Sequence, residues 1–204
     1  MDYILYVFPF FFLLYAVVYL FIALKALIKN KPSIISSEWL YALIFFSAMP
    51  FTIYNIVDLF RFGFGGSFGL VSLMVPMFHI VFLIFFYFVM KGYCVYCVSD
   101  ADFRNALIFS LNNVSIKFEE TMSKIELTEL NNELNISFTA WIGAGALKLK
   151  NRKDKIIFKK IIGGIGQYFK ENNIKPKKMV AIFYLIFGIL FIIFGAGFVK
   201  FLIR

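Results

Sequence analysis

Four long apolar segments constrain what this chain can fold into. They cover about residues 3–24, 39–60, 67–90 and the C-terminal stretch 178–204. A helix of about 20 apolar residues crosses the roughly 30 Å of hydrocarbon in a bilayer. The chain is 61% hydrophobic and 21% aromatic, whereas ordinary globular domains are about 45–50% apolar. The sequence therefore predicts an α-helical integral membrane protein with four transmembrane helices.

The third apolar segment contains the only histidine of the chain, His79. Ionisable groups inside a bilayer are costly and are often functional. Counting from the ends of the segments predicts that His79 lies at the depth of Tyr15, Ser47 and Thr52. Such a cluster can relay protons or bind a polar ligand, or its hydrogen bonds can hold helices together at about 0.6 kcal/mol each. The absence of an acidic residue near mid-depth weakens an ion-coupled transport role and favours the structural interpretation.

Asp58 and Arg61 stand three residues apart at the end of the second apolar segment. On a helix this spacing brings the two side chains together. The pair predicts an interfacial ion pair that fixes the depth of the helix. The alternative is an entrance group for a ligand or an ion.

The distribution of basic residues predicts the orientation. Lysines crowd the stretch 25–31 and the insertion 92–177, whereas Arg61, Lys200 and Arg204 lie at the opposite ends of the segments. Cytoplasmic loops carry the excess of Lys and Arg. We therefore expect a multi-pass protein of the cell membrane with both termini outside and residues 92–177 in the cytoplasm.

Residues 92–177 read as one small α+β domain in the order β-α-β-β-β-β-α. Ser99 followed by Asp102 resembles the start of a helix, and a second helix is expected over about residues 153–170, with a break near Gly163. Alternating apolar and polar residues predict strands with one buried face. Besides a first strand at 93–98, the alternating stretches are 116–119, 124–128, 134–140 and 147–150.

The stretch 148–178 carries eleven Lys or Arg and two acidic residues, and so accounts for the whole net charge of +9. One interpretation is a cytoplasmic flank with a solvated helix face. The other is contact with anionic lipid headgroups, worth about 1 kcal/mol per residue, or with a cytoplasmic protein partner. Nucleic acid is disfavoured as a partner because the sheet-facing residues are aliphatic and offer no aromatic stacking platform. The candidate contact residues are Lys153, Lys155, Lys159, Lys160, Lys170, Lys175, Lys177 and Lys178.

Cys94 and Cys97 form a single C-x-x-C motif. A zinc site needs four ligands, and residues 92–177 offer neither a second cysteine pair nor a histidine. In an extended strand, positions three apart point to opposite faces. A redox pair is therefore expected only if the chain turns back within this motif.

No pair of carboxylates, Ser/His/Asp set or metal cluster is evident, so no catalytic, cofactor-binding or metal-binding residue is predicted. The leading hypothesis is a non-enzymatic binding, sensing or assembly module with a membrane-tethered cytoplasmic domain. The alternative is a small oligomeric channel or transporter that this domain gates. A pore needs a polar stripe, which the first and fourth segments almost lack. Gly188 and Gly195 predict a close helix contact, either within the chain or in a homo-oligomer.

Overall fold

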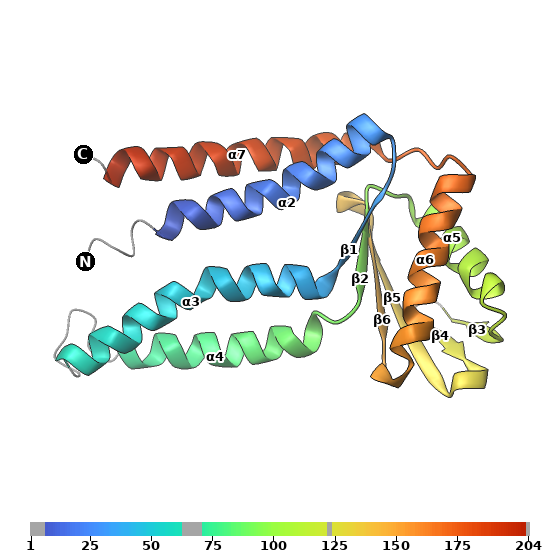
Figure 1. The fold of residues 1–204 in the computed structure, drawn as a ribbon, viewed down its shortest axis with the longest axis horizontal. Coiled ribbons are helices and arrows are strands. Elements are labelled where there is room, and N and C mark those ends of the chain that lie inside the picture. Colours follow the sequence, from blue (N-terminus) through green and yellow to red (C-terminus); the bar gives the residue numbers. More distant parts are fainter. Residues whose placement is uncertain (1–6, 63–70, 122–123, 203–204) are drawn as a thin grey trace. The chain divides into compact units, whose positions relative to one another are not determined.

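The computed structural model describes residues 7–62, 71–121 and 124–202. Contacts between residues divide the chain into two units. The helical unit comprises residues 1–17, 38–90 and 188–204, and the sheet unit comprises residues 18–37 and 91–187. The first and last apolar helices of Figure 1 therefore contribute residues to both units.

The four apolar segments are helical in the residues that the structure describes, except for Met90 at the end of the third segment. Among the described residues, three helices are long and apolar enough to cross a membrane, and the apolar part of a fourth, Pro76–Phe88, is shorter. Residues 67–70, where the third segment was expected to begin, lie outside the described residues. The helices are α2 (Val7–Lys29), α3 (Ser37–Phe62), α4 (Val71–Val89) and α7 (Lys178–Leu202).

Within the helical unit, aromatic rings join α2 to α7. The ring of Phe12 lies 6.0 Å from that of Phe191 and 5.6 Å from that of Phe198. A methyl group at Gly195 would lie 3.3 Å from the Cβ of Phe12. Gly195 therefore belongs to an intramolecular contact, one of the two alternatives that its spacing from Gly188 had left open.

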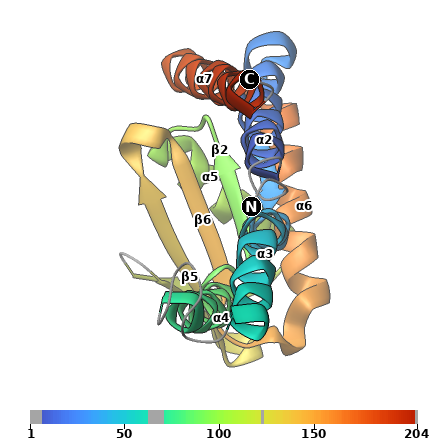
Figure 2. The same ribbon diagram turned by 90° about the vertical axis from the view of Figure 1, so that its left-hand side faces the viewer.

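The sheet unit contains a six-stranded, fully antiparallel sheet in the order β1-β2-β6-β5-β4-β3 (Figures 1 and 2). Two helices, α5 (Asp100–Asn113) and α6 (Lys155–Glu171), belong to the same unit. From β2 to α6 the elements follow the predicted order β-α-β-β-β-β-α. The strands are β1 (Ser33–Ser36), β2 (Tyr93–Tyr96), β3 (Phe118–Glu120), β4 (Lys124–Leu127), β5 (Asn132–Thr139) and β6 (Ala144–Leu149).

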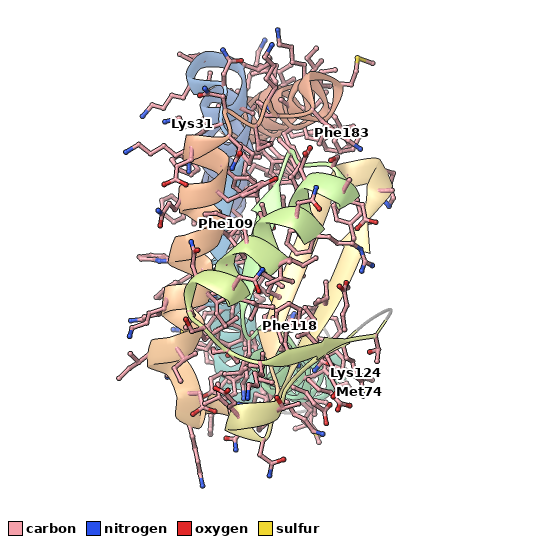
Figure 3. The ribbon with its side chains drawn as sticks, turned by 90° about the vertical axis from the view of Figure 1, so that its right-hand side faces the viewer. Lys31, Met74, Phe109, Phe118, Lys124 and Phe183 are labelled. Carbon is pink, nitrogen blue, oxygen red and sulfur yellow. The ribbon has the colours of Figure 1, made fainter. Side chains whose placement is uncertain are left out.

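One face of this sheet forms a core with α5 and α6, which lie side by side in Figure 3. The alternation predicted from sequence is visible in β6, where Leu147 and Leu149 are buried and Lys148 is not. At the start of α5, Ser99 accepts a hydrogen bond from the backbone N–H of Asp102. Fully buried members of the core include Val95, Phe103, Leu107, Leu111, Ile125, Leu134, Ile161 and Ile165.

Strand β1 was not expected from the sequence. It lies in the short connection between α2 and α3 and pairs with β2 from Ser33↔Tyr96 to Ser36↔Tyr93. The N–H of Ser37 continues this ladder by donating to the carbonyl of Gly92 at 2.9 Å. The four residues of β1 read Ser-Ile-Ile-Ser and show no alternating pattern. They are recognised as a strand only because they pair with β2, which is distant in the sequence.

The expected break in the last helix of the sheet unit is wrong, because α6 runs without interruption through Gly163, Gly164 and Gly166. Gly164 packs so closely on Ser110 of α5 that a Cβ there would collide with the serine hydroxyl. That hydroxyl donates to the carbonyl of Ile161 at 2.6 Å. Glycine therefore permits the close approach of two helices, and their contact outweighs its poor helix propensity of about 1 kcal/mol.

Candidate functional site

The predicted polar cluster is partly assembled in the helical unit. The hydroxyl of Tyr15 on α2 lies 3.3 Å from that of Ser47 on α3. Ser47 donates its only hydroxyl proton to the carbonyl of Ile44 at 2.8 Å, so Tyr15 is the donor to Ser47. The Tyr15 ring also stacks on that of Phe191, with the ring centroids 5.9 Å apart. The structure thus brings together two of the four predicted residues, Tyr15 and Ser47, through a hydrogen bond.

The other two members of the predicted cluster, Thr52 and His79, also belong to the helical unit. Thr52 on α3 is buried, and His79 on α4 is half-buried. The Tyr15–Ser47 bond is complete without the imidazole. Asn55, which sequence reasoning did not nominate, is only 2% exposed. Its spacing of three residues from Thr52 was the available signal, because residues three apart share a helix face.

The Asp58–Arg61 ion pair remains a prediction. Both residues belong to α3, and the Arg61 side chain is exposed near the end of that helix. The side chain of Asp58 lies outside the described residues.

The eight candidate lysines of the basic stretch are all exposed. In the described part of the chain none of them forms a salt bridge. Ile161 and Gly164 mark the flank of α6 that contacts α5. Helical periodicity then places Lys159 on the opposite flank of α6, where Figure 3 shows nitrogen-tipped side chains projecting outward.

The C-x-x-C motif does not turn back on itself. The chain remains extended through Tyr96 and adopts a left-handed conformation at Cys97, with a φ of 63°. Both cysteines are free, and Cys94 Sγ lies 3.6 Å from Ser37 Oγ. Burial raises the pKa of the Cys97 thiol to about 12. A thiol of such high pKa is protonated at neutral pH and is a poor nucleophile.

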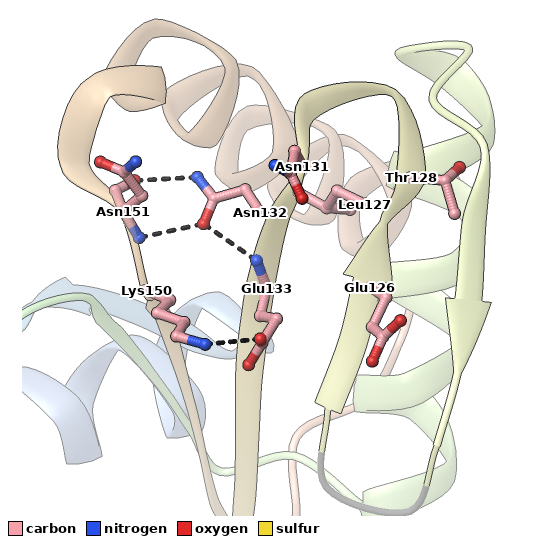
Figure 4. A pocket seen from close by; sticks show the side chains of 8 residues that line it. All are labelled: Glu126, Leu127, Thr128, Asn131, Asn132, Glu133, Lys150 and Asn151. Atoms are coloured by element: carbon pink, nitrogen blue, oxygen red, sulfur yellow. Dashed lines mark hydrogen bonds and ion pairs between the residues drawn. The ribbon is translucent and has the colours of Figure 1, made fainter.

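A polar cavity of about 510 Å³ lies where β4, β5 and the end of β6 meet (Figure 4). At its edge, buried Asn132 donates to the carbonyl of Asn151 at 2.9 Å and to Asp154 Oδ2 at 2.8 Å. Its Oδ1 accepts from the backbone N–H groups of Glu133 and Asn151. All of its hydrogen-bonding capacity is used within the fold, so Asn132 ties β5 to the turn before α6.

The sheet places three carboxylates side by side, in a row that the sequence pattern did not reveal. The register aligns Glu119, Glu126 and Glu133 in a row across β3, β4 and β5. Glu133 bonds to Lys150 at 2.6 Å and lies 3.5 Å from Lys124. The hydrogen bond from Lys150 lowers the pKa of Glu133. This carboxylate is therefore held in its ionised form, which does not suit a general acid.

Within the described residues, no group of three or more His, Cys, Asp or Glu side chains is placed to hold a metal ion. No protein-family model, curated protein or solved structure matches the chain. Any functional interpretation therefore depends on the placement of the residues themselves. The placements with most consequence are the Tyr15–Ser47 contact, the exposed lysines and the pairing of β1 with β2.

Proposed function

We propose that the chain is a four-span protein of the cell membrane with both termini outside and the sheet unit in the cytoplasm. In this proposal it works as a non-enzymatic binding, sensing or assembly module. The apolar helices anchor the sheet unit to the membrane. A conformational change in the helices would also change the conformation of the sheet unit, and the reverse. The partners are the bilayer and a ligand or protein on the cytoplasmic side.

The observation that carries the proposal is the pairing of β1 with β2. Strand β1 stands between α2 and α3, and β2 follows α4. Two strands of one sheet must lie on the same side of any membrane that the helices cross. The connection after α2 and the segment from residue 91 onward then share one side. Charge supports the same side independently, because Lys25, Lys29 and Lys31 lie at or beside the connection and lysines are frequent in the second segment.

The connections between apolar helices and sheet are short, which supports a sensing role. Helix α3 begins at Ser37, directly after β1, and three residues separate α4 from β2. Just before α7, the N–H of Lys177 donates to the carbonyl of Cys97 at 2.9 Å. Connections this short allow little independent movement of helices and sheet. A displacement of the helices would therefore be transmitted to the sheet.

The alternative is a small oligomeric channel or transporter gated by the sheet unit. It is supported by the polar residues of α3, since Thr52 and Asn55 are buried and Ser47 bonds to Tyr15. Against it, α7 carries only one polar uncharged side chain with a hydrogen-bonding group, Tyr184, in its 25 residues. A water-filled path lined by all four helices would need more polar groups than this.

The first experiment determines the orientation. Ile156 on α6 is 75% exposed, so I156C in a C94A/C97A background presents one reactive thiol. A membrane-impermeant maleimide should label it in inverted vesicles and leave it unlabelled in right-side-out vesicles. The matched control, K200C near the end of α7, should show the reverse. Labelling of both thiols from one side would refute the four-span arrangement.

The second experiment separates the module from the channel. Native mass spectrometry of the purified full-length protein gives its oligomeric state and any ligand that it retains. We expect no ring-shaped assembly and no ion flux after reconstitution into vesicles. A defined ring that conducts ions would replace the module with the channel.

The exposed lysines are proposed to contact anionic headgroups or an acidic protein partner. In nanodiscs of zwitterionic lipid they should react freely with a water-soluble amine reagent. If headgroups are the partner, adding anionic lipid should slow the labelling of Lys155, Lys159 and Lys170. Lys124 and Lys150, which are also exposed but pair with Glu133, serve as controls. If anionic lipid does not change the labelling of these lysines, headgroups are not their partner and the acidic protein partner remains as the proposal.

A further inference from the structure

The turn between β5 and β6 lies against the first turns of α7. The hydroxyl of Tyr184 donates to the carbonyl of Ile142 in this turn at 3.1 Å. Gly143 follows with a φ of 53°, and a methyl group there would lie 3.2 Å from the side chain of Val180. Glycine therefore allows both the left-handed turn and its close approach to α7. All these residues belong to the sheet unit.

Trp141 projects from this turn and remains 72% exposed. Its ring meets that of Phe183 edge to face, with centroids 6.0 Å apart and an interplanar angle of 88°. Met179, in the first turn of α7, is 81% exposed. An indole ring left this open to water is unfavourable, because aromatic side chains contribute the largest hydrophobic areas.

The position of Phe183 sets the depth of this contact. It stands five residues after Lys178, where α7 begins, which corresponds to roughly 7–8 Å along the helix axis. Lys175, Lys177 and Lys178 precede it and are exposed. A cluster of lysines followed by an aromatic side chain matches the order of headgroup layer and aromatic belt at a membrane surface.

We propose that the β5–β6 turn, residues 140–143, inserts into the membrane interface beside α7, with the indole of Trp141 at the boundary between headgroups and acyl chains. The occupant of this exposed apolar surface is lipid. The proposal rests on the proposed function, since it requires α7 to cross the bilayer. It adds a non-helical membrane contact to the sheet unit, so the lipid interface holds the sheet directly as well as through the helices.

Tryptophan fluorescence of the full-length protein in lipid vesicles tests this contact. The chain has two tryptophans, so W39F leaves Trp141 as the sole reporter, and W39Y provides a second version of the same background. We expect blue-shifted emission and weak quenching by aqueous iodide. Lipids brominated near the headgroup should quench about twofold more than lipids brominated deep in the acyl chain, as expected for an aromatic belt residue.

A tryptophan in the middle of α7 separates this proposal from the one on which it rests. Leu190 is 40% exposed, so L190W in a W39F/W141F background should be quenched most by deeply brominated lipid. If that control is not quenched by lipid, α7 does not span and the proposed function fails. If the control is quenched but Trp141 responds to iodide alone, only the interfacial contact is refuted. Protection of Trp141 from both quenchers would also refute it, because a protein surface would then cover the indole.

Discussion

In the sheet unit, Phe103, Leu134 and Ile161 have no exposed surface, whereas Phe46, Phe60 and Phe78 of the helical unit are more than half exposed. The sheet unit excludes water from its own apolar side chains by closing two helices over one sheet face. The helical unit leaves a large share of its apolar side chains open. Exposed apolar surface of this extent is rare in water-soluble monomers and marks a site of protein–protein or membrane interaction. The two units thus require different surroundings.

The same contrast governs how polar groups are used. In the sheet unit, Ser110 and Asn132 are buried and bond to backbone groups of neighbouring elements. In the helical unit the Tyr15–Ser47 bond joins α2 to α3, and the Tyr15 ring also stacks on Phe191 of α7. The buried hydrogen bonds of the sheet unit replace hydrogen bonds that the unfolded chain makes to water. Hydrogen bonds between membrane helices contribute only about 0.6 kcal/mol each to stability. Mutations of similar chemistry should therefore have different effects in the two units.

The largest difference is expected for phenylalanine truncation. F103A should lower the free energy of unfolding by about 3–5 kcal/mol, because it leaves a cavity in a closed core. F78A should change it by less than about 0.5 kcal/mol, since the Phe78 ring is 67% exposed. Denaturant unfolding of both variants in detergent, followed by circular dichroism, measures the two values. A comparable loss for F78A would show that the exposed face of the helical unit is a packed protein interface.

A large effect is also expected in the reactivity of Cys97. Burial raises its pKa from 9.0 to about 12, so the thiolate at neutral pH is roughly a thousandfold scarcer than in an exposed cysteine. In a C94A variant, maleimide should label Cys97 more slowly than an exposed thiol by at least this factor. Rapid labelling of the native protein would contradict the burial of Cys97.

The sign of the pH dependence follows from this shift. The folded pKa lies above the unfolded one, so the protonated thiol favours the folded state fully below pH 9. That contribution should be lost progressively as the pH rises toward about 12. Unfolding of C94A at a series of alkaline pH values, compared with C94A/C97A, measures the difference. The two variants should converge as the pH increases.

A smaller difference is expected for two matched serines. S110A removes the bond to the Ile161 carbonyl at 2.6 Å and should cost about 1–2 kcal/mol. S47A removes the acceptor for Tyr15 and should cost about 0.6 kcal/mol. Both are small residues on helices that contact a second helix, so their unfolding free energies can be compared directly. Equal losses of unfolding free energy in S47A and S110A would mean that the hydrogen bond in the helical unit is as strong as the one in the sheet core.

The smallest effect on stability is expected at the surface of the sheet. K150Q removes the hydrogen bond that lowers the pKa of Glu133, so the pKa should rise toward its ordinary value. A lowered folded pKa contributes stability above the unfolded value that is lost as the pH falls, and K150Q should weaken that acid dependence. Carboxyl NMR shifts across an acid titration of both proteins measure it. An unchanged Glu133 titration would leave Lys124 as its dominant partner.

The predicted elements that the structure reproduces are those with a pattern in the chain itself. Period-two alternation identified β5 and β6, and helical spacing together with Ser99 identified α5. Counting depth along the segments brought Tyr15 and Ser47 to the same level, and the structure joins them by a hydrogen bond. These inferences needed only local geometry and segment length.

The features that sequence reasoning missed depend on residues far apart in the chain. Strand β1 exists because Ser33–Ser36 finds an open edge on β2. The row of glutamates depends on the register of three strands. Gly164 stays helical because Ser110 of another helix packs on it. In each case a pairing partner supplies free energy that the local sequence does not encode.

By itself, then, the sequence determined the apolar helices, the strands with one buried face and the concentration of positive charge, because hydrophobic periodicity and segment length are properties of neighbouring residues. Only the tertiary structure decided that the connection between α2 and α3 joins the sheet, and that the β5–β6 turn rests on α7. Such contacts form where backbone groups and side chains from distant segments satisfy one another. They also connect the sheet to the apolar helices, which is where we place the function of this protein.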